Sequence, residues 1–528
     1  MNKELDDFQQ VQHSEQREYS TKELIEKFKA KEHERRKEEE KREELIRKNF
    51  QTQSNPSVII LGAGSAGIAA ASRLFENGFK NVKILEAENR IGGRVFTTKF
   101  DDYLVDIGGQ WVNGEVGNVA FDLAWPLGLL EKGKADWSSD SNEELIDSSG
   151  HILDKSEKAD LLQFHKDVEK KLEEYIDDNE NASIGVKYKY ELEKFVKSHP
   201  KWRENKKGLT NAYNRMTTLV NSAENWEDIT TADFRDFESI PGACLINWKE
   251  RGYGMIFDIM MKRYPKIEEE LPIMCNTKLN SEVSLIDYSN QNGKVIIKTT
   301  NGDEYSADYV IVTFSIGVLK EIHKSLFKPH LPEEKQKAIE GINYGNLAKI
   351  FLVFDEPWWT TSNEYTLLWK DKDFEIFQKD KEKSWLQGLI GFLPVEHKPK
   401  LLCGWVTGKH SRDLEELTDE QVLSHCIEVL HIFFGKIYNV TKPTGMIRSM
   451  WDSNKHFRGT NSYRSPKTDP EVSSYKKMSE PIGAEKPVIL FAGEATHPRY
   501  FSAVHGAIES GYREADRIIK LHENLVTN

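Results

Sequence analysis

A glycine-rich turn between two apolar runs constrains this chain more than any other feature. Residues 62–67 read GAGSAG and follow a short β-branched run at 57–61, which is typical of a buried strand. A helix is predicted over 68–76 and a second strand over 82–86. Strand, turn, helix and strand in this order predict a βαβ unit of the kind that binds dinucleotides.

Each position of the turn has a physical role in that interpretation. Gly62 permits the tight turn, Gly64 lets the backbone approach a pyrophosphate, and Gly67 lets the helix pack closely on the strand. Ser65 and Ala66 lie where the helix opens, and its N-terminal N–H groups and dipole favour phosphates. We therefore expect all five residues to contact the dinucleotide.

Charged residues at the expected spacing support the same site. Glu86 closes the second strand about 20 residues after Gly67, where a carboxylate accepts hydrogen bonds from ribose hydroxyls. An acid at this position, instead of an arginine, argues against a 2′-phosphate and leaves NAD or FAD. Arg94, after the glycine pair at 92–93, offers a bidentate fork to a phosphate.

Charge and composition exclude several functional classes. The 528 residues carry a formal net charge of −13, which disfavours nucleic-acid binding and suits a cationic small ligand. No apolar run reaches the ~18 residues of a membrane span, and no secretory or peroxisomal signal is visible. The four cysteines are far apart, so we expect reduced thiols and no metal site. A cytoplasmic protein is expected, with the nucleus as the alternative.

Residues 1–52 form a separate, highly charged zone. The stretch 29–44 reads KAKEHERRKEEEKREE, with opposite charges four residues apart that support a solvated helix. Because it has no regular a/d apolar repeat, we expect a charged helical or disordered arm and not a coiled coil. The sequence indicates no partner for this arm.

The rest of the chain alternates between helical and strand-like segments. Residues 151–235 are acidic and helical in pattern, most clearly over 154–176. Further elements are expected as strands at 279–287, 294–300, 309–314, 350–354 and 487–492, a hairpin turn at 301–302, and a last helix at 506–522. Strand–loop–helix segments near both ends suggest that the chain leaves the cofactor domain and returns to it.

Several further motifs, taken together, resemble the flavin-containing amine oxidases. They lie at 86–95 (EAENRIGGRV), 106–111 (DIGGQW), 314–320 (FSIGVLK), 490–496 (LFAGEAT) and 503–507 (AVHGA). The segment 241–254 looks most like the polyamine oxidase and spermine oxidase branch of that family. The resemblance covers about residues 56–522.

The resemblance implies an α/β fold of mixed α+β type, the amine-oxidase fold. A Rossmann-type FAD-binding domain would comprise residues 53–115, 243–318 and 446–524, and a discontinuous substrate-binding domain residues 116–242 and 319–445. The FAD is expected to be non-covalent, because no cysteine lies within the closing motif.

The resemblance also implies cofactor contacts. Glu86 would bind the ribose, Arg94 would lie near the phosphates, and the backbone N–H of Val504 would face the flavin ring. Val283 would contact adenine through its backbone, and Glu494 would lie at the start of the last FAD helix region. The other contacts expected from these motifs are Ala87, Gly109, Gln110, Trp111 and Ala503.

Lys349 is the candidate catalytic residue. By strand alternation it shares a face with Leu347, Phe351 and Val353, all apolar, and a lysine there must snorkel or be paired. The residues alone favour an edge lysine with a solvated head. The resemblance favours a catalytic role instead, because the family's lysine that holds a water at flavin N5 lies at the start of this strand.

The expected substrate site departs from the family pattern. The family usually has His or Glu two residues after the Trp of its third motif, whereas Asn113 stands here, with Glu115 nearby. Asn461 follows Arg-Gly-Thr where the polyamine branch commonly has an aromatic residue, and Tyr463 or Tyr500 would have to replace it. Ala503 is also small. These changes leave FAD binding untouched and put the substrate in doubt.

Aromatic residues are candidate walls for a substrate tunnel. Trp358, Trp359 and Trp405 are equally consistent with a tunnel wall and with core packing.

The resemblance implies an FAD-dependent amine oxidase. It would transfer a hydride from a polyamine-like substrate to flavin N5, with O2 as acceptor, giving H2O2, an aldehyde and a shorter amine. The alternative is an FAD-loaded, low-turnover binding or regulatory protein with a degraded polyamine site, which Asn113 and Asn461 favour. A histone-lysine demethylase ranks low, because the chain lacks a long antiparallel-helix insertion.

Overall fold

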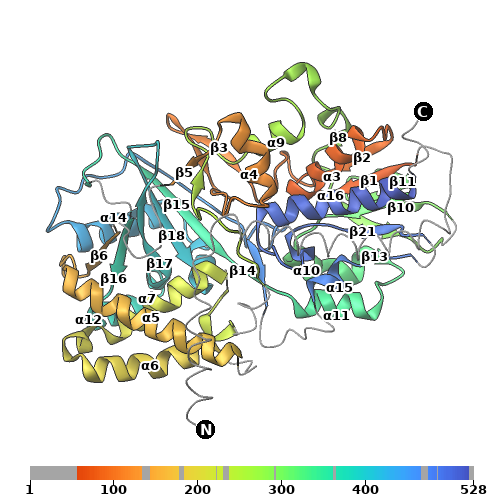
Figure 1. Ribbon diagram of the computed structural model, residues 1–528. Coiled ribbons are helices and arrows are strands. Elements are labelled where there is room, and N and C mark those ends of the chain that lie inside the picture. Colours follow the sequence, from red (N-terminus) through yellow and green to blue (C-terminus); the bar gives the residue numbers. More distant parts are fainter. Residues whose placement is uncertain are drawn as a thin grey trace, which may run out of the picture.

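A computed structural model describes residues 56–133, 143–177, 183–221, 223–229, 237–290, 293–360, 364–464, 474–483 and 486–522. The predicted arm at 1–52 lies outside the described residues. Figure 1 shows two lobes side by side, one built on a parallel sheet and one on a larger mixed sheet.

A fully parallel sheet forms the centre of the first lobe. Its strands, in spatial order, are β21 (Ile489–Phe491), β12 (Tyr309–Val312), β1 (Val58–Leu61), β2 (Val82–Leu85) and β8 (Thr277–Lys278). All four residues of β1 are buried, as expected for a strand covered on both faces. The predicted strand–helix–strand unit at the glycine-rich turn is confirmed, with the helix starting at Ser65 instead of residue 68.

Two long helices pack together on this sheet although they come from opposite ends of the chain. They are α3 (Ser65–Glu76) and α16 (Val504–Leu521), with the short helices α4 (Val119–Ala124) and α9 (Met255–Met260) beside them. A Cβ on Gly511 of α16 would lie 2.2 Å from the Ala66 carbonyl oxygen of α3. The two backbones therefore touch directly, so the C-terminal helix and β21 both return to the first βαβ unit.

A second, four-stranded sheet completes this lobe. It contains β11 (Glu304–Ala307), β10 (Val295–Thr299), β9 (Val283–Asp287) and β13 (Phe327–Lys328), with α10 (Ile316–Leu326), α11 (Glu333–Gly341) and α15 (Tyr475–Ser479). The predicted hairpin turn between β10 and β11 is confirmed. The strand expected over 279–287 is confirmed only over Val283–Asp287, because the chain turns between β8 and β9, where Asn280 has φ 53°.

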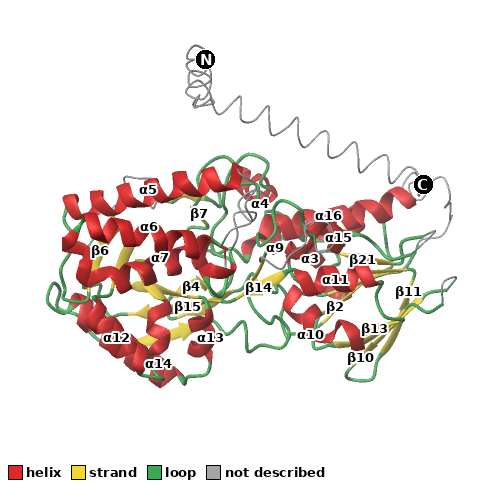
Figure 2. Cartoon of the chain, turned by 90° about the horizontal axis from the view of Figure 1, so that it is seen from below, coloured by secondary structure: helices red, strands yellow, loops and turns green. Residues whose placement is uncertain are grey.

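The second lobe is a mixed six-stranded sheet between helical layers. In spatial order its strands are β19 (Gly445–Arg448), β15 (Leu347–Val353), β18 (Leu401–Thr407), β17 (Leu389–Pro394), β16 (Glu364–Leu368) and β6 (Glu143–Asp147). The helices of this lobe are α5 (Lys155–Asp177), α6 (Ile184–Ser198), α7 (Lys206–Asn221), α12 (Asp371–Lys379), α13 (Lys409–Glu415) and α14 (Asp419–Phe434). Figure 2 shows α5, α6 and α7 over one face of the sheet, with α13 and α14 on the other.

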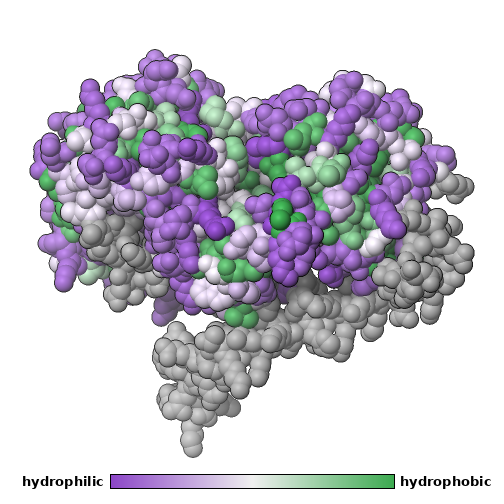
Figure 3. Space-filling view, turned by 90° about the horizontal axis from the view of Figure 1, so that it is seen from above, coloured by the Kyte–Doolittle hydropathy of each residue, from purple (hydrophilic) through white to green (hydrophobic). Residues whose placement is uncertain are grey.

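Short ribbons connect the two lobes. They pair β3 (Thr97–Phe100) with β4 (Tyr103–Asp106), β5 (Glu131–Lys132) with β7 (Ile246–Asn247), and β14 (Asn343–Gly345) with β20 (Asn461–Tyr463). Seen from above, the surface is notched between the lobes, and apolar residues reach the surface at the notch (Figure 3). Among the described residues, no helix combines the length and the apolar character needed to cross a bilayer.

Candidate active site and cofactor cradle

The glycine-rich turn is built so that only glycine fits at two of its positions. Gly62 has φ +110°, and a Cβ there would lie 2.4 Å from the hydroxyl oxygen of Thr313. A Cβ on Gly67 would lie 2.0 Å from the Gly62 carbonyl oxygen. Gly64 is the N-cap of α3 and has no side chain to cap it. The first N–H groups of this 12-residue helix are therefore left for an anion to accept.

Glu86 joins the turn to the second strand. Its carboxylate accepts hydrogen bonds from the backbone N–H of Ala63 at 2.6 Å and of Glu88 at 2.8 Å. Burial raises the pKa of Glu86 above its ordinary value, although both N–H donors oppose that rise. The Ser281 N–H also donates to the Glu86 carbonyl at 2.8 Å. This bond brings Val283, at the start of β9, close to the predicted ribose acid and to Ala87.

Arg94 and Glu494 hold two distant motifs together. The Arg94 guanidinium lies 3.1 Å from the Glu494 carboxylate, which also accepts from the Ser462 hydroxyl at 2.5 Å and the Ser502 N–H at 2.9 Å. Arg94 donates to the Thr460 carbonyl as well. The structure thus gives Arg94 a buried carboxylate as its partner, whereas the sequence suggested a phosphate.

The third motif and the closing motif meet at Gly109. A Cβ on Gly109 would lie 3.2 Å from a methyl carbon of Val504, the first residue of α16. Ala503 is the N-cap of that 18-residue helix and offers no capping side chain. The third and the closing motif are therefore in contact, and neither α3 nor α16 has a side chain that caps its first N–H groups.

Lys349 lies on β15 and is buried, with 4% of its surface exposed. Its ammonium donates to the carbonyl oxygens of Asp106 at 2.9 Å and Gly108 at 2.6 Å, and to the side-chain oxygen of Gln110 at 2.8 Å. Burial lowers the pKa of Lys349 to about 8. The interpretation as an edge lysine with a solvated head is wrong, because β15 lies between β18 and β19.

Two stacked tryptophans stand beside Lys349. Trp405 is its cross-strand partner on β18, and the rings of Trp405 and Trp111 are 5.7 Å apart with an interplanar angle of 13°. The Lys349 nitrogen lies 4.6 Å from the Trp405 ring centroid and 5.9 Å from that of Trp111. Such faces attract cations and apolar chains alike.

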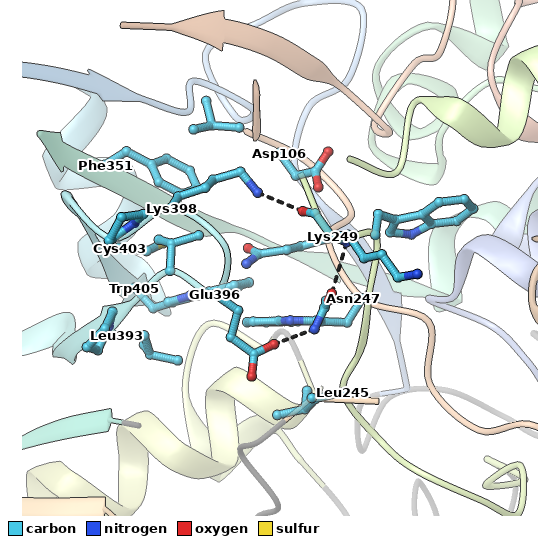
Figure 4. A pocket seen from close by; sticks show the side chains of 18 of the residues that line it. Asp106, Leu245, Asn247, Lys249, Phe351, Leu393, Glu396, Lys398, Cys403 and Trp405 are labelled. Atoms are coloured by element: carbon cyan, nitrogen blue, oxygen red, sulfur yellow. Dashed lines mark hydrogen bonds between the residues drawn. The ribbon is translucent and has the colours of Figure 1, made fainter. Parts of the chain in front are cut away.

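The Trp pair lines a cavity of about 470 Å³ between the lobes. Trp359 lines it too, whereas Trp358 packs against Phe434 in the core of the second lobe. The polar and charged residues of its wall are Asp106, Gln110, Asn247, Lys249, Thr360, Glu396 and Lys398 (Figure 4).

Several polar residues of this wall were missed as site residues by the sequence analysis. The Asn247 amide donates to the Glu396 carboxylate, and the Lys398 ammonium donates to the Lys249 carbonyl at 3.1 Å. Lys398 is 7% exposed, and burial lowers its pKa although the charges of nearby acids oppose this. Glu396 and Lys398 lie between β17 and β18 and belong to no motif, so no local pattern indicates either residue.

The expected substrate residues lie elsewhere. Asn113 is exposed and its carbonyl accepts from the Asn118 amide at 2.9 Å. The Glu115 carboxylate is 2.8 Å from the Lys132 ammonium; burial would raise its pKa, but Lys132 holds that pKa below its usual range.

Asn461 and Tyr463 also lie away from the cavity wall. The Asn461 amide donates to the Ser502 carbonyl at 3.3 Å, and Tyr463 is 4% exposed within the core beneath α5–α7. None of the four residues lines the cavity described above, so their contact with substrate stays a prediction.

Comparison with known proteins agrees with this geometry. The family profile "Flavin containing amine oxidoreductase" matches residues 65–519. The chain is 30% identical over 496 residues to the peroxisomal N(1)-acetyl-spermine/spermidine oxidase of Homo sapiens, covering 88% of this chain and 95% of that protein. It is 26% identical over 539 residues to the probable polyamine oxidase 5 of Arabidopsis thaliana, covering 88% of this chain and 98% of that protein.

A solved structure shares the fold. Cyclohexylamine oxidase from Brevibacterium oxydans IH-35A superimposes with a TM-score of 0.65 at 16% identity, over 88% of this chain and 99% of that one. The predicted amine-oxidase fold is therefore confirmed. The profile match and the 30% relative together show that this chain belongs to the flavin containing amine oxidoreductase family and is an amine oxidase with FAD as its cofactor.

Proposed function

We propose that this chain oxidises a polyamine-type amine with O2 and that water hydrolyses the imine product, giving H2O2, an aldehyde and a shorter amine. The observation that carries the proposal is the buried Lys349 ammonium, which contacts Gln110 and the ring of Trp405, two residues that line a cavity large enough for an extended amine. The relatives named as polyamine oxidases support this substrate class. They do not favour the alternative of a low-turnover binding protein.

The residues present fit FAD. The uncapped N-terminus of α3 and the Glu86 carboxylate suit a pyrophosphate and a ribose, and the Gly109–Val504 contact brings the remaining motifs to the same side of α16. When bound, FAD supplies the two-electron oxidation and the reaction with O2.

The chain's own residues would hold and prepare the amine. The Trp111 and Trp405 faces bind a cationic or apolar chain and exclude water from it. A dry, low-dielectric wall favours the neutral form of the reacting nitrogen, whose lone pair lets the adjacent carbon give up a hydride readily. The three hydrogen bonds of Lys349 would hold its ammonium in place beside the cavity wall.

A peroxide-coupled screen of purified holoprotein with polyamines, acetylated polyamines and simple monoamines tests the proposal. We expect peroxide from at least one polyamine or acylated polyamine and none from monoamines. A bound flavin that stays oxidised with the whole panel under anaerobic mixing would contradict it and would support the binding-protein alternative.

We further propose that the reaction takes place in the cytoplasm. The thiols of Cys403 and Cys426 are buried and form no disulfide, as is typical of a reducing compartment. Fluorescence microscopy of a tagged full-length chain tests this, and a peroxisomal or secreted signal would contradict it.

The cavity wall favours an amine whose far end is an amide and not a second ammonium. Lys398 uses one acceptor among the described residues, the Lys249 carbonyl, so further N–H groups are available to a ligand oxygen. A second ammonium about 5 Å from Lys398 would be repelled by roughly 3 kcal/mol at an effective dielectric constant near 20, a repulsion that the Glu396 carboxylate, which accepts from the Asn247 amide, would offset in part. A secondary amide offers an oxygen to Lys398 and an N–H to Glu396.

Lys398→Met is therefore expected to change substrate preference. We expect the ratio of kcat/KM for N-acetylspermine over spermine to fall at least about tenfold, equivalent to about 1.4 kcal/mol. Lys400→Met is the matched control, because Lys400 pairs with Glu356 at the surface at 3.3 Å. Equal ratios in the wild type and in Lys398→Met would show that Lys398 does not select the substrate.

A further inference from the structure

The ammonium of Lys349 is saturated with hydrogen bonds. A lysine ammonium has three N–H donors, and Lys349 has three acceptors: the carbonyls of Asp106 and Gly108 and the side-chain oxygen of Gln110. All three acceptors are uncharged. In this arrangement Lys349 has no N–H left for a substrate, a water or a cofactor atom.

Two of these acceptors are fixed by the backbone. Asp106 lies on β4, opposite Thr97 in the β3–β4 ribbon. Gly108 is enclosed so tightly that a Cβ there would lie 1.8 Å from the Arg94 carbonyl oxygen. Neither carbonyl can turn away from Lys349 without moving the main chain that joins the two lobes.

Gln110 is the one movable acceptor. Its amide is on a side chain, is half-buried, and belongs to the cavity wall. A carboxamide carries an acceptor oxygen and a donor NH2 group, so a half-turn of the terminal bond exchanges the two. Rotation of this one group therefore decides whether Lys349 faces an acceptor oxygen or a donor NH2 group.

We propose that Gln110 is a positioning residue that sets the state of Lys349. With its oxygen toward Lys349, Gln110 holds the charged ammonium and occupies its third N–H. With its NH2 toward Lys349, Gln110 donates to the lone pair of the neutral amine. With the amide turned away, one Lys349 N–H is released into the cavity. The proposal rests on the proposed role of Lys349 in amine oxidation.

The other groups that face Lys349 cannot make this exchange. Asp106 influences it through a carboxylate that is held by the Thr97 hydroxyl at 2.5 Å and the Tyr253 N–H at 3.0 Å. The Cys403 thiol on β18 is the other titratable neighbour, and burial raises its pKa to about 12, so it stays neutral. On the β19 side, the Ser449 hydroxyl accepts from the Lys349 backbone N–H at 2.9 Å.

The test is a titration of Lys349 in the FAD-loaded, full-length protein without any amine. The 13C resonance of its Cε in [13C]lysine-labelled protein is assigned by its absence in Lys349→Met, and its pH midpoint is measured. Gln110→Met removes an acceptor from the charged form, so the midpoint should fall by at least about half a pH unit. Gln110→Glu adds a negative charge, so the midpoint should rise by at least about one unit.

Two further variants keep the test decisive. Gln110→Asn is too short to reach Lys349 and should behave like Gln110→Met, which covers the case in which Gln110→Glu folds poorly. Gln163→Met, on the exposed face of α5, should leave the midpoint unchanged. A midpoint that stays within about 0.2 units in every folded Gln110 variant overturns the proposal.

Turnover gives the second readout. The kcat–pH profile should shift in the same direction as the midpoint in each Gln110 variant, a shift that a purely structural residue would not produce. Because the NMR titration needs no substrate, a wild type that oxidises no amine would refute the proposed function and leave this inference standing. Conversely, an active enzyme with an unmoved midpoint would refute only the role of Gln110.

Discussion

Lys349→Met should slow anaerobic bleaching of the bound flavin by its best amine at least about 100-fold, the lower end of the range for loss of a positioned proton donor or acceptor. FAD should still bind, because the Lys349 side chain makes its hydrogen bonds to Asp106, Gly108 and Gln110 and leaves the glycine-rich turn and Glu86 intact, although Gln110 is itself an expected FAD contact. Stopped-flow absorbance measures the rate, and the resting flavin spectrum measures the content.

Lys335→Met is the matched control for that variant. Lys335 is also a buried lysine, and its ammonium donates to three carbonyls at the end of α15, at 2.6, 2.8 and 2.6 Å. Because none of its three acceptors belongs to the cavity wall, its loss should lower the melting temperature while flavin bleaching keeps its wild-type rate. Equal bleaching rates in Lys349→Met and Lys335→Met would refute the assignment of Lys349.

Lys349→Met should also change how the free energy of unfolding depends on pH. Burial lowers the pKa of Lys349 from 10.5 to about 8, so between these pH values the unfolded chain binds more protons than the folded one. Lys349 therefore makes the free energy of unfolding rise with pH across this window, and both states are equally protonated below it. Urea unfolding at pH 7.5 and pH 10 should show a smaller rise in Lys349→Met than in the wild type.

Local signals in the sequence predicted the parts of the site that depend on neighbouring residues. The spacing of Gly62, Gly64 and Gly67 fixed the turn, because a Cβ at two of these positions would strike backbone or a packed side chain. Alternation along β15 predicted the apolar face around Lys349, since side chains of a strand point to opposite faces in turn.

Side-chain partners that are distant in sequence could not be predicted. Arg94 and Glu494 lie 400 positions apart, so nothing local indicates that they form an ion pair. Lys398 reaches the cavity from the connection between β17 and β18. This connection shows neither a helical or strand-like periodicity of apolar residues nor a sequence motif. Helix and strand patterns constrain the backbone, whereas cavity walls depend on how loops from different sheets meet.

Gly64→Val should give a folded protein that binds no FAD. In the structure Gly64 has φ −77°, which any residue adopts, and the nearest atom to a Cβ placed there is the Cα of Gly93 at 3.8 Å. The protein itself therefore has room for a Cβ at this position, whereas a pyrophosphate that approaches this backbone closely would leave no room for one. We expect FAD affinity to fall at least about 100-fold, or about 2.7 kcal/mol.

The adjacent glycine supplies the contrasting variant. A Cβ on Gly67 would lie 2.0 Å from the Gly62 carbonyl oxygen, so Gly67→Ala must push α3 away from β1 and should cost about 1–3 kcal/mol of stability even without FAD. Thermal unfolding of the apoproteins and fluorescence titration with FAD separate the two effects. If Gly64→Val retained yellow colour and wild-type affinity, the turn would be a structural feature alone and the cofactor would have to lie elsewhere.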